Sequence, residues 1–410
     1  MIITAVSVGT RGDVQPLIEL GVEMTRRGHV FRVAALEKFR GLAEEKDIPF
    51  IHLDGDADRV MKLLVTDYVT NMDFLAGCMT LYRETPTFME SLMRAIKGSD
   101  LVLYGTLSGF ARHVCDLYHI PCVRYFYSPF DKTNQYSLYT TKHNKVSVGL
   151  SYAMVEPGMN LLTCCLVNKW RKQNGLRRWK MTDDYRIQNG KKVLTFYPVT
   201  PILMSKDPKW KEHIQVTGYW YHPEEDARKY VPDSDLMSFL KEGEKPIFIC
   251  FGKAESDELA KLQYLTLEAL KKTKLRAVVQ ADQIAKTERT VNDQLFFVEN
   301  IPYSWMFQQV KAVVHHGGNT TNGLGLWAGL PTLVIPLALD QYFYGRAIYE
   351  NGCGPKPLYI RKKMCSQEQI EKALLELADG RYEQRAKEVS GKIRMENGCK
   401  TAADWIERNL

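Results

Sequence analysis

The chain opens with IITAVSVGTRGDVQP at residues 2–16, which predicts a β-strand, a glycine turn and the start of an α-helix. The run Ile2–Val8 is almost wholly apolar, as in a parallel strand buried on both faces. Gly9 and Gly12 let the backbone turn sharply before a helical pattern that lasts to Arg27. A second apolar run at 30–35 predicts the next strand. This order indicates a βαβ unit and hence a parallel sheet.

The same alternation recurs along the chain. Prolines, a glycine and charged residues at 198–223 interrupt it and indicate a boundary. We therefore predict an α/β protein with two Rossmann-like, doubly wound domains that face a cleft. The expected domains are 1–215 and 216–390, and 391–410 end in a helix that could pack back on the first domain. Expected strands lie at 101–104, 122–126, 246–251, 276–280, 311–315 and 331–335.

Composition excludes several protein classes. The 410 residues are 45% hydrophobic and 25% charged, which excludes a disordered tail, a collagen-like fibre and a disulfide mini-scaffold. The nine cysteines form no CxxC pair, which favours a reducing compartment over a zinc or disulfide framework. Because the N-terminus is a predicted strand without a basic leader, we expect a cytoplasmic protein.

Two features bear on membranes and nucleic acids. The apolar stretch Val146–Val167 contains Glu156 and Pro157, which argues against a spanning helix. The segment Lys169–Lys180 holds two tryptophans among six cations. This segment is compatible with a peripheral contact with an anionic membrane, and the alternative is a solvated helix and loop. The net charge of +7 suits an anionic ligand but does not require nucleic acid, which we do not expect as a partner.

The first glycine turn is not GxGxxG, so it does not favour a nicotinamide site. Asp13 begins the following helix. There it is either a helix cap, which the turn alone favours, or a general base. A base of this kind needs an orienting partner, and the sequence leaves His29, His113 or another residue open for that role.

A second turn reads HHGGNTT at residues 315–321. A glycine turn before a helix start offers free N–H groups and a positive dipole end to phosphate. The adjacent histidines point to opposite faces of a strand, which disfavours a metal site. The pair Asp340-Gln341 suits a hydroxyl-rich ligand or caps a helix, and Lys253 after Gly252 meets a phosphate or is a surface lysine.

Four segments together resemble the GT-B glycosyltransferases that use nucleotide sugars, and most of all the branch of sterol glucosyltransferases and bacterial antibiotic glycosyltransferases. The segments are GTRGDVQP at 9–16, VTGYW at 216–220, NIPYSWMF with VVHHGG within 300–318, and PLALDQYFYGRA at 336–347. The block 297–360 is the most specific part of the resemblance.

The resemblance implies a role for each matching position. Asp13 is the expected catalytic base, and Asp340 with Gln341 hold the sugar hydroxyls. The other expected nucleotide-sugar contacts are Gly12, Gly252, Lys253, Asn300, Ile301, Tyr303, His315, Gly317, Gly318, Asn319 and Thr320. The branch usually has small residues at 319 and 320 and Ser at 253, so the preferred nucleotide and sugar stay open.

The implied reaction is an inverting transfer of a hexose, by resemblance glucose, from a UDP-sugar to a hydroxyl of a hydrophobic small-molecule or lipid acceptor. It needs no metal and no tightly bound cofactor, and we expect a monomer or weak dimer. A DxD-like run from Asp54 to Asp58 is interpreted as an acidic loop. The alternatives are a nucleotide-sugar epimerase on the same fold and a non-catalytic nucleotide-sugar or lipid binder.

Overall fold

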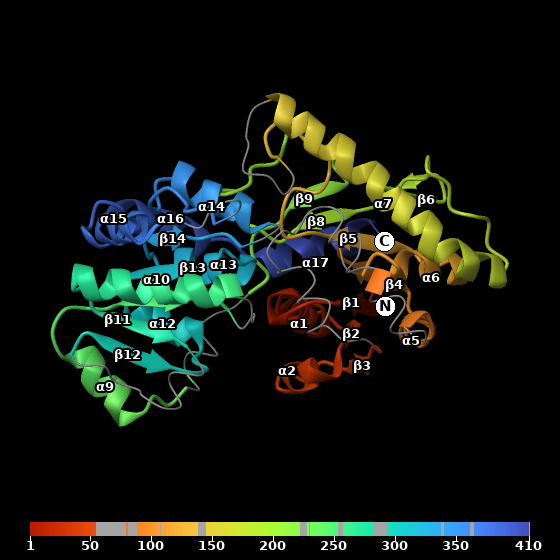
Figure 1. Cartoon of the computed structure of the whole chain (residues 1–410). Helices are drawn as coiled ribbons and strands as arrows, with labels where there is room; N and C mark the ends of the chain where they lie inside the picture. Colours follow the sequence, from red (N-terminus) through yellow and green to blue (C-terminus); the bar gives the residue numbers. More distant parts are fainter. Residues whose placement is uncertain are drawn as a thin grey trace. The chain divides into compact units, whose positions relative to one another are not determined.

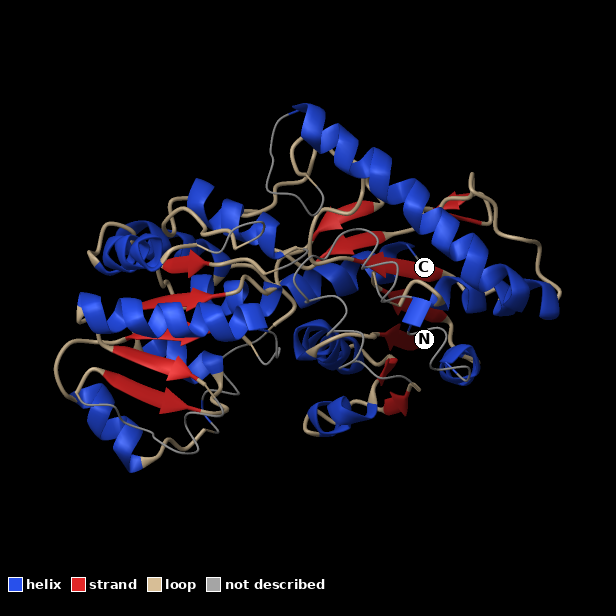
Figure 2. Ribbon diagram, viewed as in Figure 1, coloured by secondary structure: helices blue, strands red, loops and turns tan. Residues whose placement is uncertain are grey.

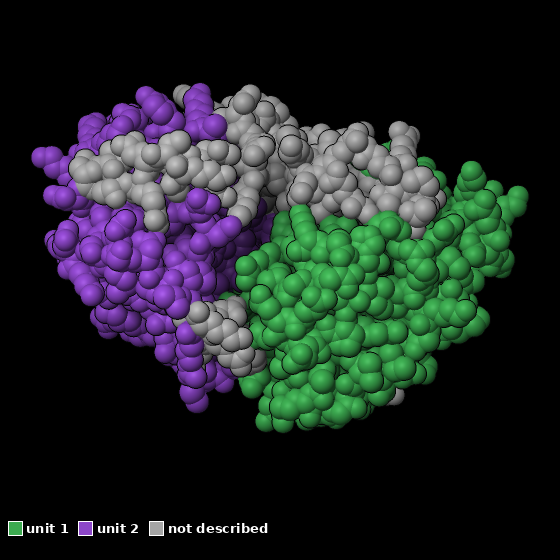
Figure 3. All heavy atoms as spheres, turned by 90° about the horizontal axis from the view of Figure 1, so that it is seen from below, with its two compact units in different colours: residues 1–221, 397–410 green, residues 222–396 purple. Residues whose placement is uncertain are grey.

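The computed structural model describes the chain apart from residues 55–78, 81–87, 107, 138–144, 222–227, 229, 253–256, 282–292, 338–339, 361–364 and 410. The chain forms two compact units, coloured separately in Figure 3. Unit 1 comprises residues 1–221 and 397–410, and unit 2 comprises residues 222–396. The boundaries predicted from the sequence lie at 215/216 and 390/391.

Unit 1 is built on a seven-stranded parallel sheet with the order β3-β2-β1-β4-β5-β8-β9 (Figure 1). The strands are β1 (Ile2–Val6), β2 (Val30–Ala35), β3 (Phe50–His52), β4 (Leu101–Tyr104), β5 (Cys122–Tyr125), β8 (Thr195–Tyr197) and β9 (Ile214–Val216). A separate antiparallel pair joins β6 (Ile187–Gln188) and β7 (Lys191–Lys192). The helices are α1 (Arg11–Arg26), η1 (Glu37–Phe39), α2 (Arg40–Glu44), α5 (Phe88–Ile96), α6 (Ala111–Tyr118), α7 (Lys145–Gln173) and α17 (Gly398–Asn409).

The main core of unit 1 lies between its sheet and helices α1 and α17. Alternate strand residues such as Ile3, Ala5 and Val33 are buried there against Leu17 of α1 and Ile406 of α17. Arg27 strengthens the contact, because its guanidinium is 2.7 Å from a carboxylate oxygen of Asp404 and of Glu407. The C-terminal helix is therefore part of unit 1.

The ends of the predicted domains differ from the units. Trp220 is buried in the core of unit 1, and its ring packs beside those of Tyr125 and Phe196. Unit 1 thus includes the segment 216–220, which the sequence analysis gave to the second domain. Arg394 donates a hydrogen bond to the carbonyl of Trp327, which keeps residues just beyond 390 on unit 2.

Unit 2 has a five-stranded parallel sheet with the order β12-β11-β10-β13-β14 and helices on both sides (Figure 2). Its core joins alternate strand residues to Leu262 of α10 and Leu374 of α15. The strands are β10 (Ile247–Cys250), β11 (Ala277–Gln280), β12 (Leu295–Val298), β13 (Ala312–His315) and β14 (Thr332–Val334). The helices are α9 (Ser234–Lys241), α10 (Asp257–Thr273), α12 (Tyr303–Gln309), α13 (Asn319–Trp327), α14 (Gln341–Glu350), α15 (Gln367–Ala378) and α16 (Glu383–Ile393).

Both sheets share one feature that positions a site. In each unit the first strand, β1 or β10, lies between the second strand and the fourth, so the strand order reverses beside it. In open α/β sheets ligands bind outside the carboxyl ends of the strands at such a switch point. The prediction of two Rossmann-like α/β domains is confirmed by this topology.

Candidate functional site

The predicted nucleotide-sugar residues that the structure describes in unit 2 follow the carboxyl ends of neighbouring strands. In the sheet register, His315 of β13 lies between Cys250 of β10 and Val334 of β14. Gly252 therefore follows one neighbour and the pair Asp340-Gln341 follows the other. The topology gathers these three segments at one edge of the sheet.

His315 is a neutral hydrogen-bond donor inside this edge. Its side chain is fully buried, and burial holds its pKa well below the usual value. Its Nδ1 accepts a hydrogen bond from the N–H of Gly317 at 2.8 Å, so the proton of the neutral ring is on Nε2. That buried Nε2–H has no hydrogen-bond partner among the described residues. A buried donor without a partner is costly, which is the state expected where a ligand supplies the acceptor.

The glycine turn after His315 has no room for side chains. Gly317 has φ of +98°, and a Cβ there would lie 2.7 Å from Val334 Cγ1 and 3.3 Å from Gln341 Cβ. A Cβ on Gly318 would lie 2.9 Å from Nε2 of His316. The turn therefore requires glycine, and it lies against the residue predicted to hold the sugar.

Asn322 fixes the turn from within α13. Its Nδ2 donates to the carbonyls of Gly317 at 2.7 Å and Gly318 at 2.8 Å. Asn322 is not among the residues predicted from the sequence, although a carboxamide four residues after a glycine turn is a usable signal. The bonds hold the carbonyls of the turn toward the helix interior.

The N-terminus of α13 has no recorded side-chain cap. Its N-cap is Gly318, which has no side chain to accept from the first N–H groups. These groups carry the positive end of the helix dipole. Asn319 in the first turn is buried and accepts a hydrogen bond from the hydroxyl of Tyr344 on α14. The helix start thus presents backbone donors beside the donor of His315.

The pair Asp340-Gln341 begins α14. The carboxylate of Asp340 stands at the N-cap position, and no side-chain capping hydrogen bond from it is recorded among the described residues. Oε1 of Gln341 accepts from the N–H of Leu337 at 2.8 Å. Gln341 thereby lies beside the turn of Gly317.

The expected nucleotide-sugar contacts Asn300, Ile301 and Tyr303 follow β12. Ile301 is buried, and the ring of Tyr303 stacks on Phe307 with centroids 5.4 Å apart. The Tyr303 hydroxyl donates to Oε1 of Gln280 at 2.5 Å, and Nε2 of Gln280 donates to the carbonyl of Glu299 at 2.9 Å. These contacts tie the segment to the end of β11.

In unit 1, Asp13 lies in the first turn of α1, after β1. Its Oδ2 accepts from the N–H of Thr10 at 2.7 Å and from the hydroxyl of Thr10 at 2.8 Å. The cap interpretation of Asp13 therefore fits its Oδ2, and Thr10 holds the carboxylate in place. Among the described residues, no hydrogen bond is recorded to Oδ1.

Burial raises the pKa of Asp13, against the two hydrogen bonds from Thr10, which lower it. A Cβ on Gly9 would collide with the carboxylate, so this glycine makes its position possible. The hydroxyl of Tyr127 donates to the Asp13 carbonyl at 3.0 Å. A half-buried carboxylate with a raised pKa and one unbonded oxygen can accept a proton.

The remaining predicted positions divide as follows. Gly12 lies next to Asp13 in α1, so both belong to unit 1, whereas the other predicted contacts belong to unit 2. Lys253, together with Asp56 and Asp58 of the acidic run, lies outside the described residues. His29 contacts Glu407 at 3.0 Å, and His113 contacts Arg171 and Tyr185, so neither histidine is recorded as a partner of Asp13.

Known proteins match this chain in sequence and fold. The family described as "Erythromycin biosynthesis protein CIII-like, C-terminal domain" matches residues 265–404. A Sterol 3-beta-glucosyltransferase of Yarrowia lipolytica is 30% identical over 428 residues, which cover 100% of this chain and 29% of that protein. The chain thus spans less than a third of the length of this relative.

Two solved structures share the fold. The glycotransferase of kitacinnamycin has a TM-score of 0.72 at 18% identity and covers 100% of this chain and 99% of its own. The spinosyn rhamnosyltransferase SpnG, complexed with thymidine diphosphate, has a TM-score of 0.67 at 14% identity, with 99% of this chain and 100% of its own covered. Together with the sequence matches, this fold makes the chain similar to the GT-B glycosyltransferases, among them sterol glucosyltransferases and antibiotic glycosyltransferases.

Proposed function

We propose that this protein is an inverting glycosyltransferase. It transfers a hexose, glucose, from a UDP-sugar to a hydroxyl of a hydrophobic small-molecule or lipid acceptor. Unit 2 binds the nucleotide sugar and unit 1 binds the acceptor. No metal and no tightly bound cofactor take part in the step.

The buried, unpartnered Nε2–H of His315 beside the uncapped start of α13 carries this proposal. When the bond between the sugar and the diphosphate breaks, negative charge grows on the leaving diphosphate. Neutral donors that are already oriented stabilise such charge without reorganisation. Asp340 and Gln341, one strand away, are the proposed partners of the sugar hydroxyls.

Asp13 is the proposed general base. Its carboxylate takes the proton of the acceptor hydroxyl as the oxygen attacks the anomeric carbon, and the leaving diphosphate departs from the opposite face. A single displacement of this kind inverts the anomeric configuration. The reaction requires both units to enclose their substrates, and the cleft between them stays a prediction.

The sugar and the acceptor are inferred from the names of relatives. The Yarrowia lipolytica relative is called a sterol 3-beta-glucosyltransferase, which favours glucose and a sterol hydroxyl. The spinosyn rhamnosyltransferase was solved with thymidine diphosphate, so the base is the less constrained part of the donor.

The test supplies purified protein with UDP-glucose, TDP-glucose, GDP-glucose or UDP-galactose, first alone and then with a sterol or a phenol. Thermal shift measures binding, mass spectrometry detects the product, and NMR gives its anomeric configuration. We expect UDP-glucose to raise the melting temperature and a glucosylated acceptor of inverted configuration to form, also in EDTA. Conversion of the free nucleotide sugar to its epimer, or binding without any transfer, would overturn the proposal.

A further inference from the structure

Helix α7 presents an apolar face to the outside of unit 1. The exposed apolar residues of α7 follow one another at helical spacing, and Leu150 and Leu161 among them are each 55% exposed. The outer face of a surface helix is normally polar. The apolar outer stripe of α7 consists of Leu150, Ala153, Pro157, Leu161 and Cys165.

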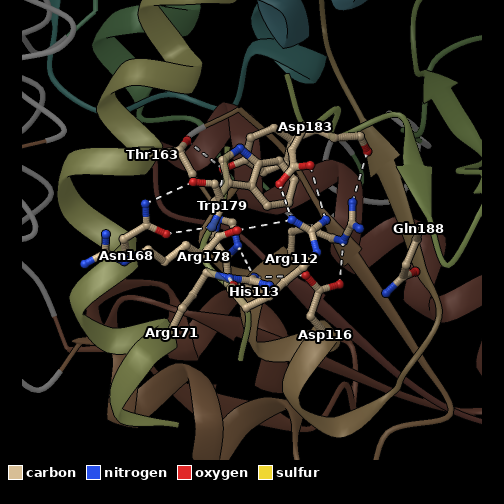
Figure 4. Close-up of polar contacts among 12 residues, drawn as sticks. Arg112, His113, Asp116, Thr163, Asn168, Arg171, Arg178, Trp179, Asp183 and Gln188 are labelled. Carbon is tan, nitrogen blue, oxygen red and sulfur yellow. Dashed lines mark hydrogen bonds and ion pairs between the residues drawn. The ribbon is translucent and has the colours of Figure 1, made fainter. Parts of the chain in front are cut away.

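The opposite face of α7 is bound to the protein (Figure 4). Thr163 hydrogen-bonds the Tyr185 hydroxyl at 2.8 Å, and Asn168 accepts from the N–H of Trp179 at 2.7 Å and donates to its carbonyl at 3.0 Å. Arg171 is buried and pairs with Asp116 at 3.0 Å.

Residues 148–173 are long and apolar enough to cross a membrane by length and composition alone, with a mean hydropathy of 1.2 over their best window. A helix with a buried arginine and several hydrogen bonds on one side cannot have lipid all around it. Its outer stripe can still meet lipid from one side, as an interfacial helix does.

Cations follow the stripe directly. The side chains of Lys169, Lys172, Arg178 and Lys180 are exposed, and no ion pair to them is recorded among the described residues. Arg177 is paired with Asp183 at 2.6 Å. Among the described residues between 148 and 181, no Asp or Glu side chain is exposed. The single acid of this stretch, Glu156, is half-buried and paired with Arg186 at 2.9 Å.

We propose that the outer stripe of α7 docks on the surface of an anionic lipid membrane. The leucines enter the boundary between headgroups and acyl chains, and the lysines and arginine contact lipid phosphates and carboxylates. A second copy of the chain is a poorer occupant, because it would bring the same cations against this face. The inference does not depend on the proposed reaction, since vesicle binding is measured without turnover.

The experiment is flotation of the full chain with phosphatidylcholine vesicles, with and without about one third phosphatidylserine. We expect binding to the anionic vesicles only, weakened by added salt. Lys169→Glu/Lys172→Glu and Leu150→Glu/Leu161→Glu should each weaken it at least about tenfold. Lys241→Glu/Lys245→Glu and Leu375→Glu in unit 2 are matched exposed changes that should leave it unaltered.

Circular dichroism and the melting temperature should match wild type for all variants, because every altered side chain is exposed. Equal binding by all variants, or no binding to anionic vesicles, would refute the docking face. So would a vesicle-free change in molecular mass caused by Leu150→Glu/Leu161→Glu, which would show that a second copy occupies the stripe.

Discussion

The turn after β1 in unit 1 and the turn after β13 in unit 2 both lie at the switch point of a parallel sheet, and the two sheets share the order of their first five strands. The helices that follow them begin differently. In unit 1 the carboxylate of Asp13 accepts from the backbone and side chain of Thr10, so the start of α1 already holds an anion of the protein. In unit 2 the start of α13 has no side-chain cap, and His315 adds a buried donor without a partner.

Under the proposed function, this difference lets one architecture serve two chemical tasks. A helix start occupied by its own carboxylate favours the ionised form of that carboxylate, and burial opposes it, so the group stays ready to take a proton. A helix start without such a carboxylate attracts the anion of a ligand. Substitutions in the two turns test this contrast.

Asp13→Asn removes the proposed base and keeps an oxygen that can accept from Thr10. We expect kcat to fall by about 10²- to 10⁴-fold, because a positioned base contributes that much. Nucleotide affinity, measured by calorimetry, should stay the same because Asp13 belongs to unit 1. Asp100→Asn is the control, since Asp100 also accepts a backbone hydrogen bond, from Ile2. Unchanged turnover of Asp13→Asn would remove the base assignment.

His315→Ala removes the neutral donor at the switch point of unit 2. We expect kcat/KM to fall by about 10²- to 10³-fold and nucleotide diphosphate affinity to fall with it. His113→Ala is the comparison, because His113 is likewise buried with a pKa well below its usual value. It should lower the melting temperature without changing nucleotide affinity. Equal nucleotide affinity in wild type and His315→Ala would contradict the site.

Gly317→Ala tests whether the turn after His315 requires glycine. Its φ of +98° and the contact of the new Cβ with Val334 should cost about 1–3 kcal/mol of unfolding free energy. Denaturant unfolding measures this loss. Gly391→Ala on α16, where a Cβ meets no atom within 4 Å, should be neutral or slightly stabilising. Equal stability of the two variants would show that the turn tolerates a side chain.

Thr10→Val tests the turn after β1 by removing only the hydroxyl that donates to Asp13. The Thr10 hydroxyl bond lowers the pKa of Asp13, so its loss should raise that pKa further. A base works when ionised, so activity is lost as pH falls through the pKa. The acidic limb of the kcat/KM profile should therefore move to higher pH, with turnover above the limb almost unchanged. Thr10→Ser should restore the wild-type limb, and a limb that does not move would argue against this coupling.

Most apolar strands were predictable from the sequence, whereas three short strands of unit 1 were not. The run at 246–251 corresponds to β10, and the run at 311–315 to β13. The strands β3, β8 and β9 have three residues each, too few to show a period of two. They form because a neighbouring strand supplies hydrogen-bond partners, which no local pattern reveals.

Within the candidate site, the residue types were readable and their partners were not. The HHGG motif predicted a turn before a helix. Only the packed structure shows that Nδ1 of His315 accepts a hydrogen bond from Gly317 and that Nε2 has no hydrogen-bond partner among the described residues. From the sequence, Asp13 could be interpreted as a helix cap or as a general base. The structure assigns one oxygen to Thr10, which permits both interpretations at once.

The alternation of apolar runs and glycine turns determined two parallel α/β sheets and the strand ends that carry polar residues, because periodicity and turn chemistry are local properties. Tertiary structure decided which unit holds the C-terminal helix and which face of α7 stays exposed. It also decided which buried nitrogen lacks a partner. These facts depend on atoms far apart in the sequence, and only the packed chain brings them within reach of one another.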